Sequence, residues 1–577
     1  MLKLRRFLAD YKKEVVIGPI CKLFEAILEL LVPLVMADII DVGINTLHDS
    51  GYVLGRGALM VLLAAMGLTS ALFCQYFASK ASQGAGTKIR RALLKHINSL
   101  SYAELDRLGT PSLITRMTSD VNQVQQSIAM SIRLLTRAPF IIVGSLVMAM
   151  TINLQLSLIF FAASVLIALT LYVITRKSVP LFSSAQKKLD RIGLITRENL
   201  SGSRVIRAFS KQEIENRRVD AATDDLARTS VRVSKLSALL SPVTYAVTDA
   251  AIIAIVWFGA VKVNAGDMQT GDIVALVSYM TQILLAMVVV ANLVILMTKA
   301  SACAERINEV FETKPSVKEN AIQNISVNEK CADKLRFENV SFHYNDGKDV
   351  LTDISIAVPR GATLGIIGGT GCGKSSLIRL IPRFYDVSGG SVLIDGADVR
   401  DYPFAQLRRK MGIVPQNSVL FAGTIRDNMK WRAPDATDEQ IIAALKTAQA
   451  YEFVSRLSDG LDSHVEQGGR NFSGGQRQRL CIARALIGSP ELLILDDSFS
   501  ALDMATDSAL RRALKQCAAD MTMIIVTQRC ASVREADIII CMDDGRIVGC
   551  GTHEALMRDC GVYRAICLSQ QSAEVSA

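Results

Sequence analysis

The residues best suited to chemistry lie in the last third of the chain, beginning with a glycine-rich stretch. LGIIGGTGCGKSS matches the pattern G-x-x-x-x-G-K-[ST] between Gly368 and Ser375. Glycines let successive backbone N–H groups wrap a phosphate, while the lysine and the serine can reach phosphate oxygens and a magnesium ion. A strand is predicted before the stretch and a helix after it, which disfavours a turn that binds nothing. The predicted phosphate-binding residues are Gly368, Gly369, Thr370, Gly371, Cys372, Gly373, Lys374, Ser375 and Ser376.

A second chemical signal is the acidic end of the stretch LLILDDSFSALD. The apolar residues 492–495 predict a buried strand that runs directly into Asp496 and Asp497. An acid at such a strand end is the expected second holder of magnesium in a phosphate-loop ATPase, so Asp496 takes that role. The next position often carries a glutamate that handles the attacking water. Asp497 is one methylene shorter, which raises the question of whether the site hydrolyses ATP or only binds it.

The whole chain is too long and too apolar to be one soluble domain. It has 577 residues, of which 50% are hydrophobic, with a mean hydropathy of +0.30 and a net charge of +9. This length predicts at least two parts, and this composition points to a membrane.

Six apolar segments predict a membrane domain ahead of the phosphate-binding part. A bilayer core of about 30 Å needs roughly 20 apolar residues per helix. We expect spans at about 15–47, 53–82, 131–151, 154–176, 236–262 and 272–299, with a turn near residues 151–153. The predicted organisation is a helical transmembrane domain over 1–312, a linker over 313–333, and an α/β nucleotide-binding domain over 334–577.

The distribution of basic residues predicts the topology. Residues 84–128 hold six Lys/Arg against three acids, and residues 175–236 hold fourteen against seven. Basic loops stay inside, so both termini and the α/β domain are expected in the cytoplasm, with the spans in the cell membrane. This explains the positive charge without nucleic-acid binding. The start, MLKLRRFLADYKKE, is expected to lie on the inner membrane surface as an amphipathic helix.

The cysteines predict no structural framework. Twelve occur, without a CxxC pair or regular spacing. We expect reduced thiols that mostly fill the core.

The stretch NFSGGQRQRLCIARAL is the most discriminating motif. Its SGGQ turn exposes donors at a helix start, which suits a phosphate. Together with the phosphate loop and the six spans, it resembles the signature of half-size ABC exporters, in which one six-helix transmembrane domain is fused to one ABC ATPase domain. The resemblance covers nearly the whole chain. It implies ATP and Mg²⁺ as ligands and a second half-size subunit as partner. It also implies that the ATP bound to the partner is contacted in trans by Ser473, Gly474, Gly475, Gln476 and Asp503.

The same resemblance assigns further roles. Tyr344 resembles the aromatic residue that stacks on adenine, although a core tyrosine is the plain alternative. Gln416 resembles the glutamine that touches magnesium, so the expected Mg²⁺ ligands are Ser375, Gln416 and Asp496. SYAELDRLGTPSLITRMTSDVNQV and ENLSGSRVIRAFSKQE resemble the two cytoplasmic coupling segments.

Two positions depart from the family pattern. Asp497 replaces the catalytic glutamate, and Gln528 in MTMIIVTQR replaces the switch histidine. Removing one methylene withdraws a carboxylate by about 1.5 Å, and a misplacement near 1 Å can cost on the order of 10²-fold in rate. Glutamine cannot carry a proton as imidazole can. We therefore predict a degenerate site that binds ATP and hydrolyses it slowly, in a heterodimer whose partner keeps both residues. A homodimer with two slow sites is the alternative.

The cargo does not follow from the sequence. Lys22, Glu25, Glu29 and Asp249 lie within spans, where they could line an acidic cavity for cationic amphipaths. The simpler interpretation, which we favour, is that Lys22 pairs with Glu25 and the others lie near the interface. We expect a multidrug-type exporter of small amphipathic compounds, an ATP-driven translocase. A lipid, peptide or small-thiol exporter and a regulatory or gating subunit are the alternatives.

Overall fold

The computed structural model describes residues 2–319, 331–344, 347–517 and 521–575, which form two compact units. The helical unit consists of Met1–Asn98 and Thr110–Thr313, and the α/β unit consists of Ser99–Gly109 and Lys314–Ala577. The predicted fold class, a membrane-type helical domain followed by an α/β domain, is confirmed. Residues 320–330 of the predicted linker lie outside the described residues.

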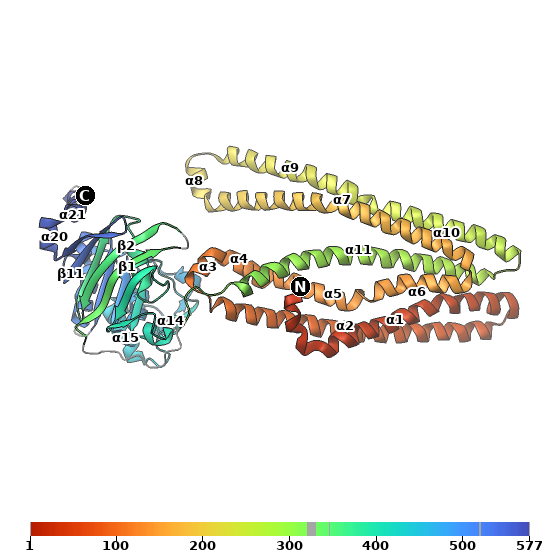
Figure 1. The fold of residues 1–577 in the computed structure, drawn as a ribbon, viewed down its shortest axis with the longest axis horizontal. Coiled ribbons are helices and arrows are strands. Elements are labelled where there is room, and N and C mark those ends of the chain that lie inside the picture. The colour runs from red at the N-terminus through yellow and green to blue at the C-terminus, as the bar shows by residue number, and fades with distance from the viewer. Residues whose placement is uncertain (1, 320–330, 345–346, 518–520, 576–577) are drawn as a thin grey trace. The chain divides into compact units, whose positions relative to one another are not determined.

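The helical unit is built from long helices whose lengths exceed a membrane crossing. α2 and α7 each have 48 residues and α11 has 43, so these helices continue well past the roughly 20 residues that a bilayer needs. α7 and α9 run side by side, joined through the short α8 (Figure 1). The elements are η1 (Leu2–Tyr11), α1 (Lys12–Asp38), η2 (Ile39–Leu47), α2 (Ser50–Ile97), α4 (Thr110–Thr115), η3 (Arg116–Asp120), α5 (Val121–Leu134), α6 (Arg137–Ile152), α7 (Leu154–Ser201), α8 (Ser203–Ala208), α9 (Gln212–Ala238), α10 (Leu240–Asn264) and α11 (Thr270–Glu312).

Five helical stretches among the described residues are long and apolar enough to cross a membrane. The remaining predicted span, 15–47, lies in α1 and η2 and carries five charged residues, Lys22, Glu25, Glu29, Asp38 and Asp41. These charges are why it does not join the five, and a count of six spans stays a prediction. The five are Ser50–Ile97, Thr110–Ile152, Leu154–Ser201, Gln212–Asn264 and Thr270–Glu312.

The turn between two of these stretches is encoded by one residue. α6 ends at Ile152, and the Asn153 side chain accepts hydrogen bonds from the backbone N–H groups of Gln155 and Leu156 at 3.1 and 3.2 Å. Asparagine is a favoured helix N-cap because its side chain satisfies N–H groups that have no partner inside the helix. The turn predicted near residues 151–153 is confirmed.

The N-terminal segment is a short helix that packs on other helices of its unit. η1 is a 3-10 helix, and its Leu4 is only 4% exposed, packed with Ile89, Val121 and Ile307. An amphipathic face can be buried against neighbouring helices as well as against lipid. Here neighbouring helices bury Leu4, while Lys3, Arg5 and Arg6 stay exposed, and a position on the membrane surface stays a prediction.

The α/β unit contains a six-stranded sheet, a four-stranded antiparallel sheet and one short pair. The strand order is β12-β11-β3-β10-β9-β6 in the first, β2-β1-β4-β5 in the second and β7-β8 in the pair. Its strands are β1 (Asp333–His343), β2 (Asp349–Pro359), β3 (Thr363–Gly368), β4 (Gly389–Ile394), β5 (Ala397–Asp398), β6 (Met411–Val414), β7 (Gly423–Thr424), β8 (His464–Val465), β9 (Leu492–Asp496), β10 (Thr522–Thr527), β11 (Ile538–Asp543) and β12 (Arg546–Gly551).

Helices cover the sheets of this unit. They are α3 (Tyr102–Leu108), α12 (Lys374–Leu380), α13 (Phe404–Arg409), α14 (Ile425–Met429), α15 (Asp438–Thr447), α16 (Tyr451–Ser455), η4 (Gly460–Asp462), η5 (Gln467–Gly469), α17 (Gly474–Leu486), α18 (Met504–Cys517), α19 (Cys530–Val533), α20 (His553–Asp559) and α21 (Gly561–Val575).

The central strands are apolar throughout because both faces of the six-stranded sheet are covered. All residues of β9 and β10 are buried. Successive side chains point to opposite faces of a strand, so Leu493 and Leu495 enter one hydrophobic cluster, while Leu492 and Ile494 enter the other. A continuous apolar run is typical of such buried parallel strands.

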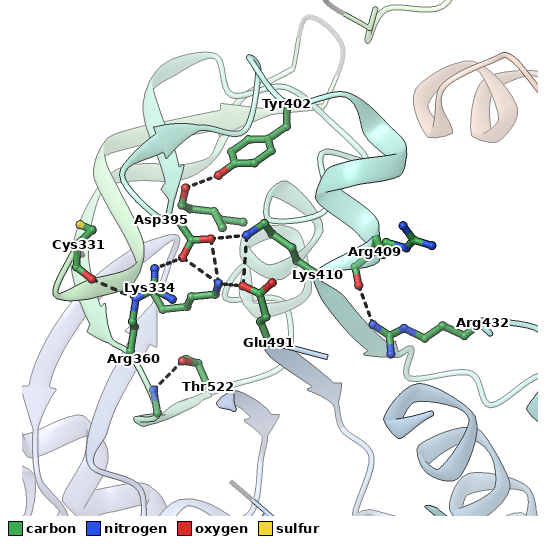
Figure 2. A network of polar contacts seen from close by, with 12 residues as sticks. Cys331, Lys334, Arg360, Asp395, Tyr402, Arg409, Lys410, Arg432, Glu491 and Thr522 are labelled. Atoms are coloured by element: carbon green, nitrogen blue, oxygen red, sulfur yellow. Dashed lines mark hydrogen bonds and ion pairs between the residues drawn. The ribbon is translucent and has the colours of Figure 1, made fainter. Parts of the chain in front are cut away.

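A buried ion-pair network joins the two sheets (Figure 2). Asp395, at the turn after β4, accepts from Lys334 at 2.8 Å, Lys410 at 2.7 Å and Arg360 at 2.6 Å. Glu491, just before β9, pairs with both lysines. Lys334 and Asp395 are each 1% exposed. Burial raises the pKa of Asp395, but Lys334 and Lys410 more than offset this and hold it below its ordinary value.

Candidate functional site

Three neighbouring parallel strands bring the predicted site residues together. β10 lies between β3 and β9, with Val526 paired to both Ile366 and Asp496. Because the carboxyl ends of parallel strands share one edge of the sheet, the segments that follow Gly368, Asp496 and Thr527 meet there. They enclose a hollow of about 230 Å³ whose lining includes Thr370, Gly371, Gly373, Lys374, Ser375, Ser376, Gln416, Asp496, Asp497 and Gln528.

The loop after β3 has the conformation that a phosphate cradle needs. Gly371 and Gly373 have φ of +84° and +97°, which residues with side chains rarely adopt. No atom lies within 4 Å of a Cβ placed on Gly369 or Gly371, so the loop is open at these glycines. The Lys374 ammonium lies across the loop and donates to the carbonyls of Gly368 and Gly369 at 2.8 and 2.6 Å. The geometry fits the triphosphate of a nucleotide.

The predicted magnesium ligands also lie together. The Ser375 hydroxyl donates to Asp496 Oδ1 at 3.2 Å, and Gln416 lines the same hollow. Asp496 is only 7% exposed, and this burial raises its pKa. A hydroxyl, an amide oxygen and a carboxylate are hard oxygen ligands of the kind that Mg²⁺ prefers, and a bound cation favours the ionised carboxylate. The described residues therefore fit this ion.

Asp497 is held rigidly, so the length of its side chain decides how far its carboxylate reaches. Its backbone is left-handed, with φ of +48°. Its N–H donates to the Val526 carbonyl at 2.9 Å, and its carbonyl accepts from Gln478 at 3.2 Å and Ser500 at 2.9 Å. Burial raises the pKa of the carboxyl. With the backbone tied at these points, the loop cannot easily shift to compensate for a missing methylene.

Gln528, just after β10, is among the residues that line the hollow, and its role as the switch residue stays a prediction. Its side chain is exposed, and its backbone carbonyl accepts from the Gln570 amide at 2.6 Å. The contact to α21 was missed by sequence reasoning, because no motif links two residues 42 positions apart.

Tyr344 lies beside the phosphate loop rather than in the lining of the hollow. Its hydroxyl shares a hydrogen bond with Ser376 at 3.0 Å. Its ring packs edge-on against Phe342 and Tyr385, with centroids 4.7 and 5.2 Å away. It is half-buried. Adenine stacking stays a prediction for this residue.

The signature residues form a separate exposed feature at the start of α17. Ser473 and Gln476 make a reciprocal capping box, in which the Ser473 hydroxyl accepts from the Gln476 N–H at 3.3 Å and the Gln476 side chain accepts from the Ser473 N–H at 2.9 Å. Ser473, Gly474 and Asp503 are exposed. The structure does not bring them to the hollow of their own chain, and their role in trans stays a prediction.

Comparison with known proteins decides the family. Residues 15–287 match the family described as the ABC transporter transmembrane region, and residues 351–500 match the family described as ABC transporter. The chain is 38% identical to an uncharacterised ABC transporter ATP-binding protein of Mycobacterium tuberculosis over 98% of its own length and 97% of the relative's. This chain belongs to the ABC transporter family.

Two further likenesses agree with a half-size ABC exporter. The transporter is 27% identical to an ATP-dependent lipid A-core flippase of Vibrio parahaemolyticus, over 97% of this chain and 96% of the relative. Its fold matches a bacterial Atm1-family ABC exporter with ATP bound, with a TM-score of 0.79 at 23% identity and 98% of both chains covered. The chain is thus an ABC exporter with a membrane-spanning region and an ATP-hydrolysing domain.

In this ABC transporter the start of the first predicted coupling segment, α3, folds with the ATPase domain. α3 lies in sequence between helices of the helical unit, yet it belongs to the α/β unit. The Tyr102 ring stacks on Phe384 with centroids 4.4 Å apart, and the Tyr385 hydroxyl donates to Asp106 at 2.8 Å. Burial, and then this bond, raise the pKa of Tyr385. Because Tyr385 also packs on Tyr344, α3 is connected through two rings to the phosphate loop.

Tyr385→Phe should lower ATP turnover of the full transporter about fivefold and leave its ATP affinity unchanged within about twofold. The ring contacts remain, but the hydrogen bond to a charged partner is lost. Turnover in lipid vesicles and nucleotide binding would be measured side by side. Tyr402→Phe is the matched control, because its buried hydroxyl donates to the Ile394 carbonyl at 2.8 Å and makes no contact with α3. Equal losses in both variants would show a general packing effect instead.

The charges inside the first predicted span are paired. Lys22 bonds Glu25 at 2.6 Å, and Glu29 bonds Arg137 at 2.6 Å. This agrees with the simpler of the two interpretations for Lys22 and Glu25. Asp249 is exposed on α10.

The helical unit also contains an apolar cavity of about 420 Å³ between α6, α7 and α11. Tyr172, Thr175 and Arg176 supply its polar side-chain groups, and the arginine donates to the tyrosine hydroxyl at 3.2 Å. The lining residues are Ile142, Ala168, Leu171, Tyr172, Thr175, Arg176, Met287, Val290, Ala291 and Val294.

Proposed function

We propose that this chain is one half of a heterodimeric exporter of small amphipathic compounds, and that its own site binds Mg–ATP but hydrolyses it slowly. The observation that carries the proposal is Asp497. Its backbone is fixed at the edge of the ATP hollow by hydrogen bonds at both its N–H and its carbonyl, so the short side chain holds the carboxylate back. Gln528, in the same lining, cannot relay a proton.

Binding does not depend on these two positions. Lys374, Ser375 and the open glycine loop have the geometry for a triphosphate, and Tyr344 stands beside them for the base. Mg²⁺, held by Ser375, Gln416 and Asp496, supplies charge neutralisation at the phosphates. Asp497 in its present position orients water poorly, so hydrolysis is slow while nucleotide stays bound.

The intact signature supports an asymmetric pair. Ser473 and the glycines after it stand at the start of a helix of thirteen residues, where an anion is stabilised. This chain lacks the catalytic glutamate but keeps an intact signature. The signature is therefore most useful if it completes the ATP site of a different, catalytically competent subunit in trans. In a homodimer the same signature would serve only slow sites.

The apolar cavity supports an amphipathic cargo. Its hydrocarbon lining suits an apolar body, and Arg176 and Tyr172 in the lining suit a polar head. The lipid flippase among the relatives makes lipid export the nearest alternative on the same architecture. Peptide or small-thiol export, or a gating role without transport, are further alternatives. The basic loops support an orientation with the ATPase domain and both termini in the cytoplasm and the spans in the cell membrane.

The deciding experiment compares ATP turnover of the purified chain, alone and co-purified with the half-size transporter encoded beside it. Asp497→Asn should change turnover of the pair less than twofold, whereas Glu→Gln at the partner's catalytic position should remove nearly all of it. Vectorial uptake of dyes, lipids and peptides into vesicles then separates the cargo classes, and absence of any uptake would favour the gating role. Brisk turnover by the chain alone, abolished by Asp497→Asn, would overturn the proposal in favour of a homodimer with a working aspartate.

A further inference from the structure

Helix α21 is tied to the segment that carries the switch residue. The Gln570 side chain reaches both ends of this segment, because its Nε2 donates to the Gln528 carbonyl at 2.6 Å and its Oε1 accepts from the Cys530 N–H at 2.9 Å. Cys567 lies three residues earlier, on the same face of α21, and forms a disulfide with Cys530. One helix face thus holds residues 528–530 by two hydrogen bonds and one covalent bond.

The disulfide corrects the expectation that the cysteines are all reduced. Its Cα atoms are 5.6 Å apart, and the two residues are 37 positions apart in the sequence. Cys530 is 9% exposed and Cys567 3%, and both belong to a buried cluster with Val533 and Tyr563. The spacing 530 to 567 carries no motif, since the pair forms only once α21 packs back beside α19.

The contacts from α21 hold the chain on the C-terminal side of Gln528, where no strand pairing holds it. On the N-terminal side, Thr527 ends β10, which is paired on both edges. On the C-terminal side, the chain leaves the sheet at once, and it is held by the contacts to α21 together with the bonds of Arg529 to Thr527 and Ser500. Since Gln528 lines the hollow with Lys374 and Asp497, small shifts of residues 528–530 change what faces the nucleotide.

We infer that α21 positions Gln528 through Gln570, and that the Cys530–Cys567 pair makes this positioning dependent on redox state. In the oxidised form the switch segment cannot leave α21. In the reduced form α21 keeps only its two hydrogen bonds to the segment, beside those of Arg529 to Thr527 and Ser500, so the segment samples other positions and holds nucleotide less firmly. Gln570, Cys530 and Cys567 are positioning residues in this account. The inference depends only on ATP binding in this hollow, and stands whichever subunit hydrolyses.

The chemistry is a balanced thiol–disulfide exchange. In the oxidative direction, the two thiols lose two electrons and two protons and form one S–S bond. The oxidant is a low-molecular-weight disulfide, whose S–S bond breaks and takes up those electrons and protons to give two thiols. The first step is a mixed disulfide, which we place at Cys530 because it is the more exposed partner, and the second thiol then displaces the small thiol.

The test uses the full chain in vesicles, with its partner subunit where it requires one, in buffers of reduced and oxidised dithiothreitol. Release of a fluorescent ATP analogue from this chain's site should be about fivefold faster under reducing conditions, as expected when a positioning contact is weakened. The change should follow the same redox titration as thiol labelling of Cys530, read by mass spectrometry. A purely structural disulfide would not link these two curves.

Variants separate the contributions. Cys530→Ser and Cys567→Ser should each release nucleotide at the reduced rate in every buffer. Cys550→Ser, which removes an exposed free thiol, should keep the redox response. Gln570→Glu keeps an acceptor for the Cys530 N–H but cannot donate to Gln528, so it should speed release even when oxidised. Release rates that ignore the redox buffer while Cys530 labelling changes would overturn the inference, as would a response retained in Cys567→Ser.

Discussion

Asp497→Glu and Gln528→His combined in one chain should raise ATP hydrolysis at this site by about 100-fold. The longer glutamate side chain extends the carboxylate to the position that aspartate cannot reach from the fixed backbone. A misplacement near 1 Å lowers the reaction rate on the order of 10²-fold. The histidine supplies a group that can carry a proton near neutral pH. Single-turnover hydrolysis of ATP would be measured in a pair whose partner site is inactivated, so that only this site reports.

The control must separate catalysis from the cost of a longer side chain on a left-handed backbone. Asp544 provides it, because it also has a positive φ, +41°, and lies exposed between β11 and β12. Asp544→Glu should leave hydrolysis unchanged. Adding Lys374→Ala to the double variant should remove the gain. An unchanged rate in the double variant, with ATP binding intact, would mean that Asp497 is not what limits hydrolysis.

Asp395→Asn should destabilise the α/β unit by about 3–5 kcal/mol, the cost expected when one partner of a buried ion-pair network is removed. Asp395 accepts bonds from three cations, and an amide offers them only one oxygen together with a competing donor. Lys334, 1% exposed, would then keep only Glu491 as an anionic partner. Urea unfolding of the full transporter, followed by hydrogen exchange of peptides from β1 and β4, measures the loss.

Asp333→Asn is the matched control for this prediction. Asp333 stands next to Lys334 on the same strand and pairs with Arg336 at 2.8 Å, but the Arg336 side chain is 49% exposed. Exposed pairs contribute about 0–1 kcal/mol, so this variant should lose little. Comparable losses in both variants would mean that the buried network adds nothing beyond a surface pair.

Acid provides a second check on the same network. The pKa of Asp395 and that of Glu491 are both held below their ordinary values, in spite of burial, by the lysines that bind them. A lowered pKa in the folded state stabilises the protein above the ordinary carboxyl pKa of about 4, and this stability is lost as the pH falls through the lowered value. The difference between the natural chain and Asp395→Asn should therefore shrink below about pH 4.

The sequence alone determined the family, the two kinds of domain and the local parts of the ATP site. The phosphate loop, the acidic end of β9 and the turn at Asn153 are encoded by consecutive residues, whose backbone preferences and hydrogen bonds act within a few positions. Parallel strand order then brings Lys374, Asp496 and Gln528 to one sheet edge. This is why residues chosen by motif were found lining one hollow.

Only the tertiary structure decided the long-range partners. Tyr385 and Asp106 are 279 positions apart, Lys334 and Glu491 157, and Cys530 and Cys567 37. No pattern of residue types selects such pairs, because each side chain could meet many others until the helices and sheets are packed. The left-handed backbone of Asp497 could not be predicted from the sequence either. It is held by hydrogen bonds to Val526 and Gln478, which belong to other elements, and to Ser500, further along the loop. The local motifs of the site can thus be predicted from the sequence, while the long-range contacts that position its residues arise only from packing.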